Sequence, residues 1–358
     1  MPGVLDGTAL MAEAVVHDFE ESGFGGQGIL TIGGRGTGKT TLCMELMQRD
    51  AYLESDRISK TEYMAVYKQR KMIEAKMLSE GYRPQDIVGA LPKFPCREIP
   101  ETVLYSGREF DYWHNFIEKD IWQHYDSPKP VRLHLPQGEE FHFVVEFGDG
   151  LRDLILDGIV KPYSDSRQVV ANLLEGGINV FYPPKDFTFC PEIMENFTRR
   201  NISDKTLQTK QLNWMNFELV YMLMQYRYKK HTTWFADEVH SLLPSMARDL
   251  EWHVIDWFSR EVDPELRRCH ISSFGSSHKC TNIDSRHMNI AEWYIWTGGA
   301  NPDRRYSMVK SATNRCHAGR CIIERKGWRF GLFDYDRLEG QLPKIRAVRG
   351  GLDKIGLK

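Results

Sequence analysis

The residues best suited to chemistry are a glycine-rich run that ends in lysine and threonine. The run matches the spacing G-x-x-x-x-G-K-[ST] in full and reads Gly33, Gly34, Arg35, Gly36, Thr37, Gly38, Lys39 and Thr40. Such a turn, after a strand and at the start of a helix, aims backbone N–H groups and the helix dipole at phosphate oxygens. Lys39 would reach the β- and γ-phosphates, Thr40 would ligate Mg²⁺, and Thr41 would touch the α-phosphate. The alternative is a glycine-rich turn that merely caps a helix.

Two adjacent carboxylates follow an apolar run farther along the chain. Residues 233–236 (TWFA) lead into Asp237 and Glu238, and the carboxyl end of a central strand faces the crevice where open α/β sheets bind ligands. Asp237 would hold magnesium through its water shell, and Glu238 would polarise the water that attacks in phosphoryl transfer. The alternative is a helix N-cap formed by Asp237. Because a nucleotide kinase more often lacks the second acid, the pair favours hydrolysis.

The next predicted strand, 271–274, is followed by residues that would orient water. Ser276, Ser277 and His278 stand just beyond its end, where a polar side chain next to the acidic strand senses the γ-phosphate. An ordinary polar turn is the alternative for these three residues.

Arginines before that strand are candidates for acting on a neighbouring subunit. Arg267 and Arg268 lie where a ring would place its next protomer, and an arginine supplied in trans accelerates such reactions by ~10³–10⁵. Arg304 and Arg305 compete for this role, and solvated surface charge is the alternative for all four.

The elements that must position these residues alternate between strands and helices. Besides those already mentioned, we expect strands at 29–32, 141–147, 178–182 and 293–296, a terminal hairpin at 321–324 and 329–333, and helices through about 47 and at 59–80, 166–175, 211–229 and 246–261. Alternation of this kind predicts an α/β fold with a mostly parallel sheet flanked by helices.

Together these blocks resemble the FtsK–HerA superfamily of DNA-pumping P-loop ATPases, which includes viral genome-packaging ATPases and the N-terminal domain of the zonula occludens toxin type. The family's arginine segment corresponds to 267–271 (RRCHI), and a downstream stretch corresponds to 281–286 (TNIDSR). His278 stands where the family usually has glutamine, a departure that bears on the sensor assignment. The resemblance implies a RecA-like (ASCE) P-loop fold, ATP and Mg²⁺ as ligands, and a ring of subunits, possibly a hexamer, around double-stranded DNA.

The resemblance also suggests how the chain is divided. We expect a P-loop ATPase core at 28–50 and 166–340, interrupted by a partly helical, mixed insertion at 51–165 after the P-loop helix. A helical segment at 1–27 would precede the core, and a basic tail at 341–358 would follow it.

Composition narrows the class of protein. The 358 residues are 41% hydrophobic and 27% charged, which suits a globular protein, and no apolar run is long enough to cross a membrane. The N-terminus lacks the features of a signal peptide, and seven cysteines without framework spacing favour the reducing cytoplasm or, if the source is viral, the host cytoplasm or the virion. Cys316 and Cys321 have no matching partner pair, so we expect no zinc.

A net charge of −2 leaves any contact with DNA to local basic patches. Candidates are the basic residues of 60–76, then Arg199, Arg200, Lys205 and Lys210, and the tail residues Lys344, Arg346, Arg349, Lys354 and Lys358. Two other classes stay open: an AAA-type or signalling P-loop NTPase that acts on proteins, and a nucleotide-binding switch. The first would need a helical lid after residue 292, where strand patterns stand instead.

Overall fold

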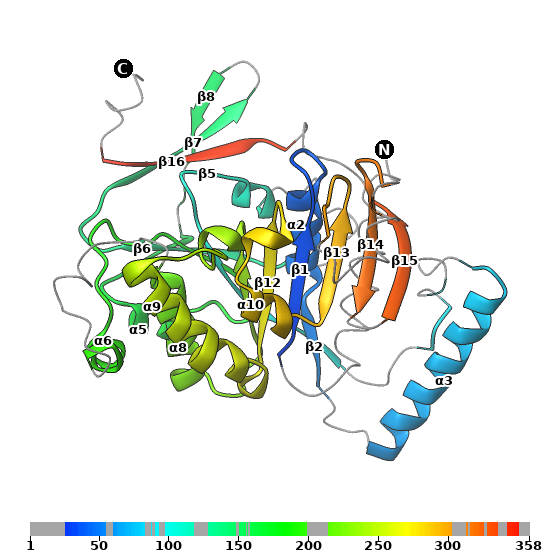
Figure 1. Cartoon of the computed structure of the whole chain (residues 1–358). Coiled ribbons are helices and arrows are strands. Elements are labelled where there is room, and N and C mark those ends of the chain that lie inside the picture. The colour runs from blue at the N-terminus through cyan, green and yellow to red at the C-terminus, as the bar shows by residue number, and fades with distance from the viewer. Residues whose placement is uncertain are drawn as a thin grey trace.

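The computed structural model describes residues 26–54, 60–82, 87, 90–92, 97–117, 128–147, 150–154, 156, 158–198, 214–302, 313, 316–325, 328–335 and 342–350. In this part of the chain a large central sheet is covered on both sides, and a small antiparallel sheet lies above it (Figure 1). Within the same residues, no helix combines the length and apolar character that crossing a membrane requires.

The central sheet, as far as the described residues show, has ten strands. Its order is β15 (Trp328–Asp334), β14 (Arg320–Arg325), β13 (Trp293–Thr297), β1 (Gly28–Ile32), β12 (Ile271–Ser277), β11 (Thr232–Ala236), β4 (Thr102–Ser106), β10 (Ile178–Phe181), β6 (Val131–Pro136) and β9 (Val160–Tyr163). Neighbours from β13 to β9 run parallel, whereas β14 and β15 add on antiparallel. The expected mostly parallel α/β fold is therefore confirmed.

Helices bury both faces of the parallel strands, which explains why these strands are apolar without alternation. Successive residues of one strand enter opposite cores: Ile29 packs with α2 (Lys39–Arg49), and Leu30 packs on the other side. That second side carries most of the helices (Figure 1), namely α5 (Ser166–Ala171), α6 (Pro191–Thr198), α8 (Trp214–Tyr226), α9 (Asp249–Trp257) and α10 (Ser285–Ile290). Short turns complete it: η2 (Val239–Ser241), η3 (Phe258–Val262), η4 (Asp263–Glu265), η5 (Arg267–Cys269) and η6 (Cys280–Asn282).

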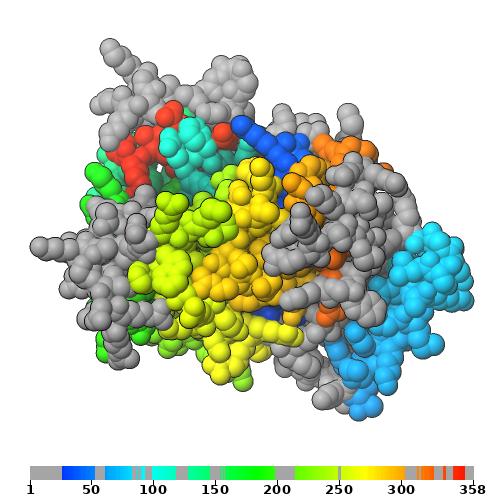
Figure 2. All heavy atoms as spheres, in the orientation of Figure 1, coloured from blue at the N-terminus to red at the C-terminus, as the bar shows by residue number. Residues whose placement is uncertain are grey.

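The small sheet covers the central sheet beside α2. Its order is β5 (Phe110–Asp111), β16 (Lys344–Arg349), β7 (Phe141–Phe147) and β8 (Gly150–Asp153). Phe143, Ile345 and Ala347 point from it into the α2 core, together with η1 (Trp113–Phe116). The third sheet consists of two strands, β2 (Ala51–Glu54) and β3 (Arg97–Pro100). Between them in the sequence lies α3 (Lys60–Ser79), which projects from the body (Figures 1 and 2).

Two of the expected boundaries need correction. Strands β4, β6 and β9 come from 51–165, so much of the expected insertion belongs to the central sheet rather than standing outside it. The tail expected at 341–358 contributes strand β16, which pairs with β5 and β7. Both errors have the same cause: the strands are short, separated by prolines, and paired with segments far away in sequence. The helical segment expected at 1–27 lies almost wholly outside the described residues.

A buried polar cluster joins three elements at the amino edge of the parallel strands. Asp50, at the end of α2, is fully buried and accepts a hydrogen bond from Thr233 of β11. The same hydroxyl lies 3.1 Å from Glu101, beside β4, and the Asp50 carbonyl accepts the Glu101 N–H at 2.9 Å. The cluster therefore holds together α2, β4 and β11, whose other ends carry candidate site residues.

This cluster leads to a prediction about stability. Burial and then the charge of Glu101 raise the pKa of Asp50 well above its ordinary value, so the folded protein holds this proton more tightly than the unfolded chain. The stability it contributes is present at low pH and is lost as pH rises above the aspartate range. Asp50→Asn should raise the free energy of unfolding by about 1 kcal/mol near pH ~8 and by little near pH ~4.

Urea unfolding at both pH values measures this difference, with Asp186→Asn, on an exposed residue, as the control. A less stable Asp50→Asn protein at the higher pH would show that the carboxylate is needed in its ionised form.

Candidate functional site

The glycine-rich turn joins β1 to α2 and takes a shape that only glycine adopts easily. Gly36 and Gly38 have φ values of 72° and 87°, in the left-handed region that other residues rarely enter. A side chain on Gly33 would fall on the Thr297 hydroxyl of β13. Its backbone is held by Gly33 N–H to Ser277 O at 3.1 Å and by Gly34 N–H to Gly298 O at 2.9 Å. The glycines therefore serve a folded loop between three strand ends, which a simple helix cap does not require.

Lys39 and the two threonines open α2. The Lys39 ammonium lies 3.0 Å from Gly33 O, 2.7 Å from Gly34 O and 3.4 Å from His278 Nδ1. Thr40 lines a cavity beside the turn, whereas Thr41 is buried, with a hydroxyl that has no hydrogen-bond partner among the described residues. The roles expected for Thr40 and Thr41 stay predictions.

The two acids follow β11 directly, as expected. Asp237 accepts hydrogen bonds from the Ser276 hydroxyl and, at 3.1 Å, from the Glu238 N–H. Glu238 has a left-handed backbone with φ 49°. Non-glycine residues seldom adopt this conformation, and those that do are often found at functional sites. The short turn η2 begins after Glu238 and has no side-chain cap. The helix-cap interpretation of Asp237 therefore finds no support here.

The sheet order brings the two motifs together. Only β12 lies between β1 and β11, and parallel strands end at the same edge. A cavity of ≈ 220 Å³ is accordingly lined by residues of the glycine-rich turn and the acidic pair, among them Gly36, Lys39, Thr40, Asp237 and Glu238. Among the described residues, no group of three or more His, Cys, Asp or Glu side chains is arranged to hold a metal ion.

The carboxyl end of β12 lies between the two motifs: the strand extends beyond the expected 271–274 to include Ser276 and Ser277, and His278 follows it. His278 connects the two motifs, because its Nδ1 faces Lys39 and its Nε2 lies 3.5 Å from Glu238 Oε1. Ser276 binds Asp237 and accepts the Glu238 N–H at 3.0 Å, and Ser277 faces His240 at 3.1 Å. These contacts suit a residue that responds to the γ-phosphate, which stays a prediction for His278.

Sequence reasoning missed Arg108, which follows β4. Its guanidinium lies 3.0 Å from Glu238 Oε2 and 3.5 Å from Asp237 Oδ2, and also donates to the Asp237 carbonyl. Burial opposes ionisation of Glu238, but Arg108 outweighs it, so the pKa of Glu238 lies below its ordinary value. The only signal in the sequence is an arginine soon after the apolar run 103–105 (VLY), within the stretch expected to be an insertion.

Asp111 positions the loop that carries Arg108. Its carboxylate accepts the Arg108 N–H at 3.1 Å, the Tyr112 N–H at 2.7 Å and the Tyr105 hydroxyl. Burial raises the pKa of Asp111 to about 6 despite these hydrogen bonds. The Arg108 backbone is thus fixed on both sides, since Gly107 N–H also donates to Phe181 O at 2.8 Å.

The expected arginines are placed elsewhere. Arg267 and Arg268 lie in η5, before β12, at the edge of the sheet opposite to the glycine-rich turn. Arg267 pairs with Glu292 at 2.8 Å and Arg268 with Glu265 at 2.6 Å. Neither reaches the site of its own chain, so only a role in a neighbouring subunit stays a prediction. Arg304 and Arg305 lie outside the described residues.

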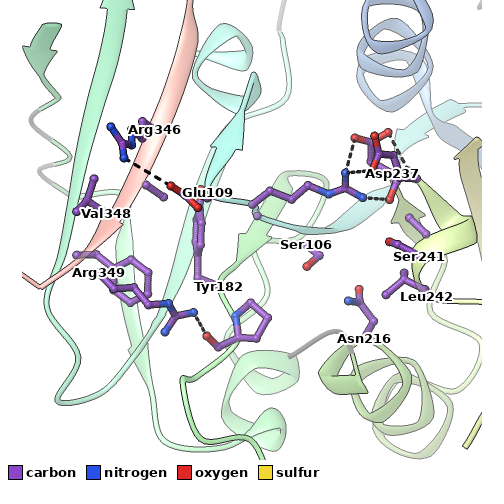
Figure 3. Close-up of a pocket in the computed structure, with 17 residues that line it drawn as sticks. Ser106, Glu109, Tyr182, Asn216, Asp237, Ser241, Leu242, Arg346, Val348 and Arg349 are labelled. Atoms are coloured by element: carbon purple, nitrogen blue, oxygen red, sulfur yellow. Dashed lines mark hydrogen bonds and ion pairs between the residues drawn. The ribbon is translucent and has the colours of Figure 1, made fainter. Parts of the chain in front are cut away.

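A second, larger cavity of ≈ 610 Å³ (Figure 3) shares Arg108, Asp237 and Glu238 with the smaller one. Asp237, Ser241 and Asn216 line one end of it, and Arg346 and Arg349 of β16 line the other. Arg346 lies 3.7 Å from Glu109, and Arg349 pairs with Glu139 and the Pro183 carbonyl. These two arginines of β16 are therefore already matched by acids of the same chain.

The residues present fit a magnesium–nucleotide. Thr40 and Asp237 offer hydroxyl and carboxylate oxygens, which Mg²⁺ prefers, and both line the smaller cavity. The unpartnered, buried hydroxyl of Thr41 and the left-handed glycines beside it are features of a loop built around a further group rather than around its own side chains.

Comparisons with known proteins add little. No protein-family model matches the chain, and no curated protein matches it either. Among solved structures, it is similar to the genome packaging NTPase B204 from Sulfolobus turreted icosahedral virus 2 in complex with ATP-gammaS, at TM-score 0.32 and 8% identity over 66% of this chain and 98% of that one. The same protein in complex with AMPPCP gives TM-score 0.32 and 9% identity over 66% and 98%.

B204 from Sulfolobus turreted icosahedral virus, described as its DNA-packaging ATPase, gives TM-score 0.31 and 8% identity over 66% and 98% of the two chains.

Proposed function

We propose that this chain is a magnesium-dependent ATPase whose reaction takes place between the glycine-rich turn and the acidic pair. The observation that carries the proposal is the shared cavity that Lys39, Thr40, Asp237 and Glu238 line. The fold by itself does not require the glycine-rich turn and the acidic pair to line the same cavity. Their meeting across β12 is what hydrolysis of a nucleoside triphosphate requires.

The residues divide the work of hydrolysis. The turn at 33–40 and Lys39 would bind the phosphates, and Thr40 and Asp237 would hold Mg²⁺, which neutralises charge on the transferred group. Glu238 would accept a proton as the water oxygen bonds to the γ-phosphorus. The bond from that phosphorus to the β–γ bridging oxygen breaks, and ADP leaves with its electron pair. His278, between Lys39 and Glu238, would orient the water.

For the finer function we propose a DNA-translocating motor of the FtsK–HerA type, assembled as a ring. Support comes from the sequence resemblance and from the sheet order, in which β12 separates the strands of the two motifs. Arg267 and Arg268 lie on the surface, 52% and 72% exposed, as a contribution to a neighbouring subunit would need. Within the described residues, α3 carries exposed Lys68 and Lys76 away from the body (Figure 2).

Turnover with and without duplex DNA tests the finer function. We expect ATP hydrolysis to rise several-fold with DNA, with a stimulation that weakens as salt increases because phosphate contacts are screened. Phosphate release at two salt concentrations, with heparin as a polyanion control, gives the measurement. Turnover that ignores DNA would indicate a machine acting on proteins, and binding without turnover would indicate a nucleotide-dependent switch.

A further inference from the structure

Arg108 occupies a position that matters for the proposed reaction. It is the described arginine that contacts both acids of the pair, and its side chain lines the smaller cavity and the larger one. The guanidinium therefore lies where the two cavities meet, beside Asp237 and Glu238, which also line both of them.

The contacts of Arg108 occupy the carboxylate oxygens that Asp237 and Glu238 would use in the proposed reaction. Asp237 already gives one carboxylate oxygen to Ser276 and faces Arg108 with the other, so the water shell of a magnesium ion would compete with the guanidinium for the same oxygen. Glu238 likewise pairs with Arg108 through Oε2, and a paired carboxylate is a weaker base. Both acids need Arg108 to give up contacts before they serve a metal ion and a water.

The anchoring of Arg108 allows such an exchange. Asp111 and Phe181 hold the backbone of residues 107–108, whereas the long side chain is about a third exposed, at 31%. A guanidinium is a planar fork that suits two oxygens of a phosphate as well as those of a carboxylate. Lys39, another cation that lines the smaller cavity, also contacts protein oxygens where phosphate is expected.

We propose that Arg108 exchanges partners during the reaction: it leaves the acidic pair when a magnesium–nucleotide binds and contacts the γ-phosphate in the transition state. This inference rests on the proposed ATPase function. It makes Arg108 a catalytic residue supplied by the same chain, so that each subunit carries its own arginine whether or not Arg267 or Arg268 of a neighbour also contributes.

The exchange predicts a particular pattern of binding. Arg108→Ala removes the competitor of magnesium, so its affinity for Mg·ATP should equal or exceed that of the unchanged protein. Interactions made only in the transition state raise turnover and not substrate affinity, so turnover should fall by about 10³-fold. Affinity for Mg·ADP with tetrafluoroaluminate, which mimics the transferring phosphoryl group, should fall by at least ~10-fold. Arg108→Lys should recover little, because an ammonium lacks the fork.

Calorimetric titration with both ligands, together with phosphate release, decides the matter. Arg346→Ala is the matched control, since it removes an arginine that lines the larger cavity without contacting the acids. Unchanged affinity of Arg108→Ala for the tetrafluoroaluminate complex would overturn the proposal, as would weaker binding of both ligands, which indicates a merely structural arginine. The two calorimetric titrations test the role of Arg108 even if the protein shows no turnover. Absence of turnover in the unchanged protein would contradict the proposed ATPase function and not the proposed exchange of Arg108.

Discussion

Glu238→Gln is expected to bind ATP as tightly as the unchanged protein and to lose about 10²–10⁴-fold in turnover. The amide keeps the shape of the side chain and its hydrogen bond with Arg108 through the remaining oxygen, but it cannot accept the proton of the attacking water. The pKa of Glu238 lies below its ordinary value because Arg108 outweighs the effect of burial, so the base is ionised across the neutral range.

Single-turnover hydrolysis and the Kd of a fluorescent ATP analogue separate the two effects. Glu140→Gln, an isosteric change at an exposed glutamate on the turn before β7, is the control that should leave both unchanged. Because Arg108 lowers the pKa of Glu238 in the protein without nucleotide, kcat/KM of the unchanged protein should decline only when pH falls below the usual glutamate range. Normal hydrolysis by Glu238→Gln would remove Glu238 from the mechanism.

Lys39→Ala is expected to weaken ATP binding by about 10²-fold or more, which corresponds to the loss of charge-assisted hydrogen bonds to two phosphates. Lys39 contacts Gly33 O and Gly34 O in the turn itself, so the ammonium also helps to hold the loop. Turnover should fall below detection at ATP concentrations that saturate the unchanged protein.

Equilibrium binding of ATP and of ADP measures the loss for each phosphate. We expect the penalty to be larger for ATP, because the β- and γ-phosphates are the groups that Lys39 would reach. Lys161→Ala is the control, because it also removes one positive charge, but on the edge strand β9 of the central sheet. This variant should bind both nucleotides as the unchanged protein does. Equal losses for ATP and ADP would instead mean that Lys39 acts through the shape of the loop.

Local patterns carried much of the fold. The strand–turn–helix at 28–49 and the strand before Asp237 lie where periodicity and glycine spacing predicted them, because each is specified by neighbours in the chain. The helix expected at 59–80 is confirmed as α3 and ends just before Gly81, whose φ is 87°. The strands of 102–163 were missed in part, since a short buried strand without alternation resembles any other apolar stretch.

The sequence alone predicted the roles of Lys39, Asp237 and Glu238, because each residue lies in a short motif whose members are only a few positions apart. Only the tertiary structure decided that Arg108 joins them. Its place depends on β4 lying beside β11, a pairing of segments well over a hundred residues apart that no local pattern encodes. Two other long-range pairings had similar effects: β12 beside β1 puts Arg267 and Arg268 at the end of the sheet away from the glycine-rich turn, and β16 beside β7 makes a strand of 344–349.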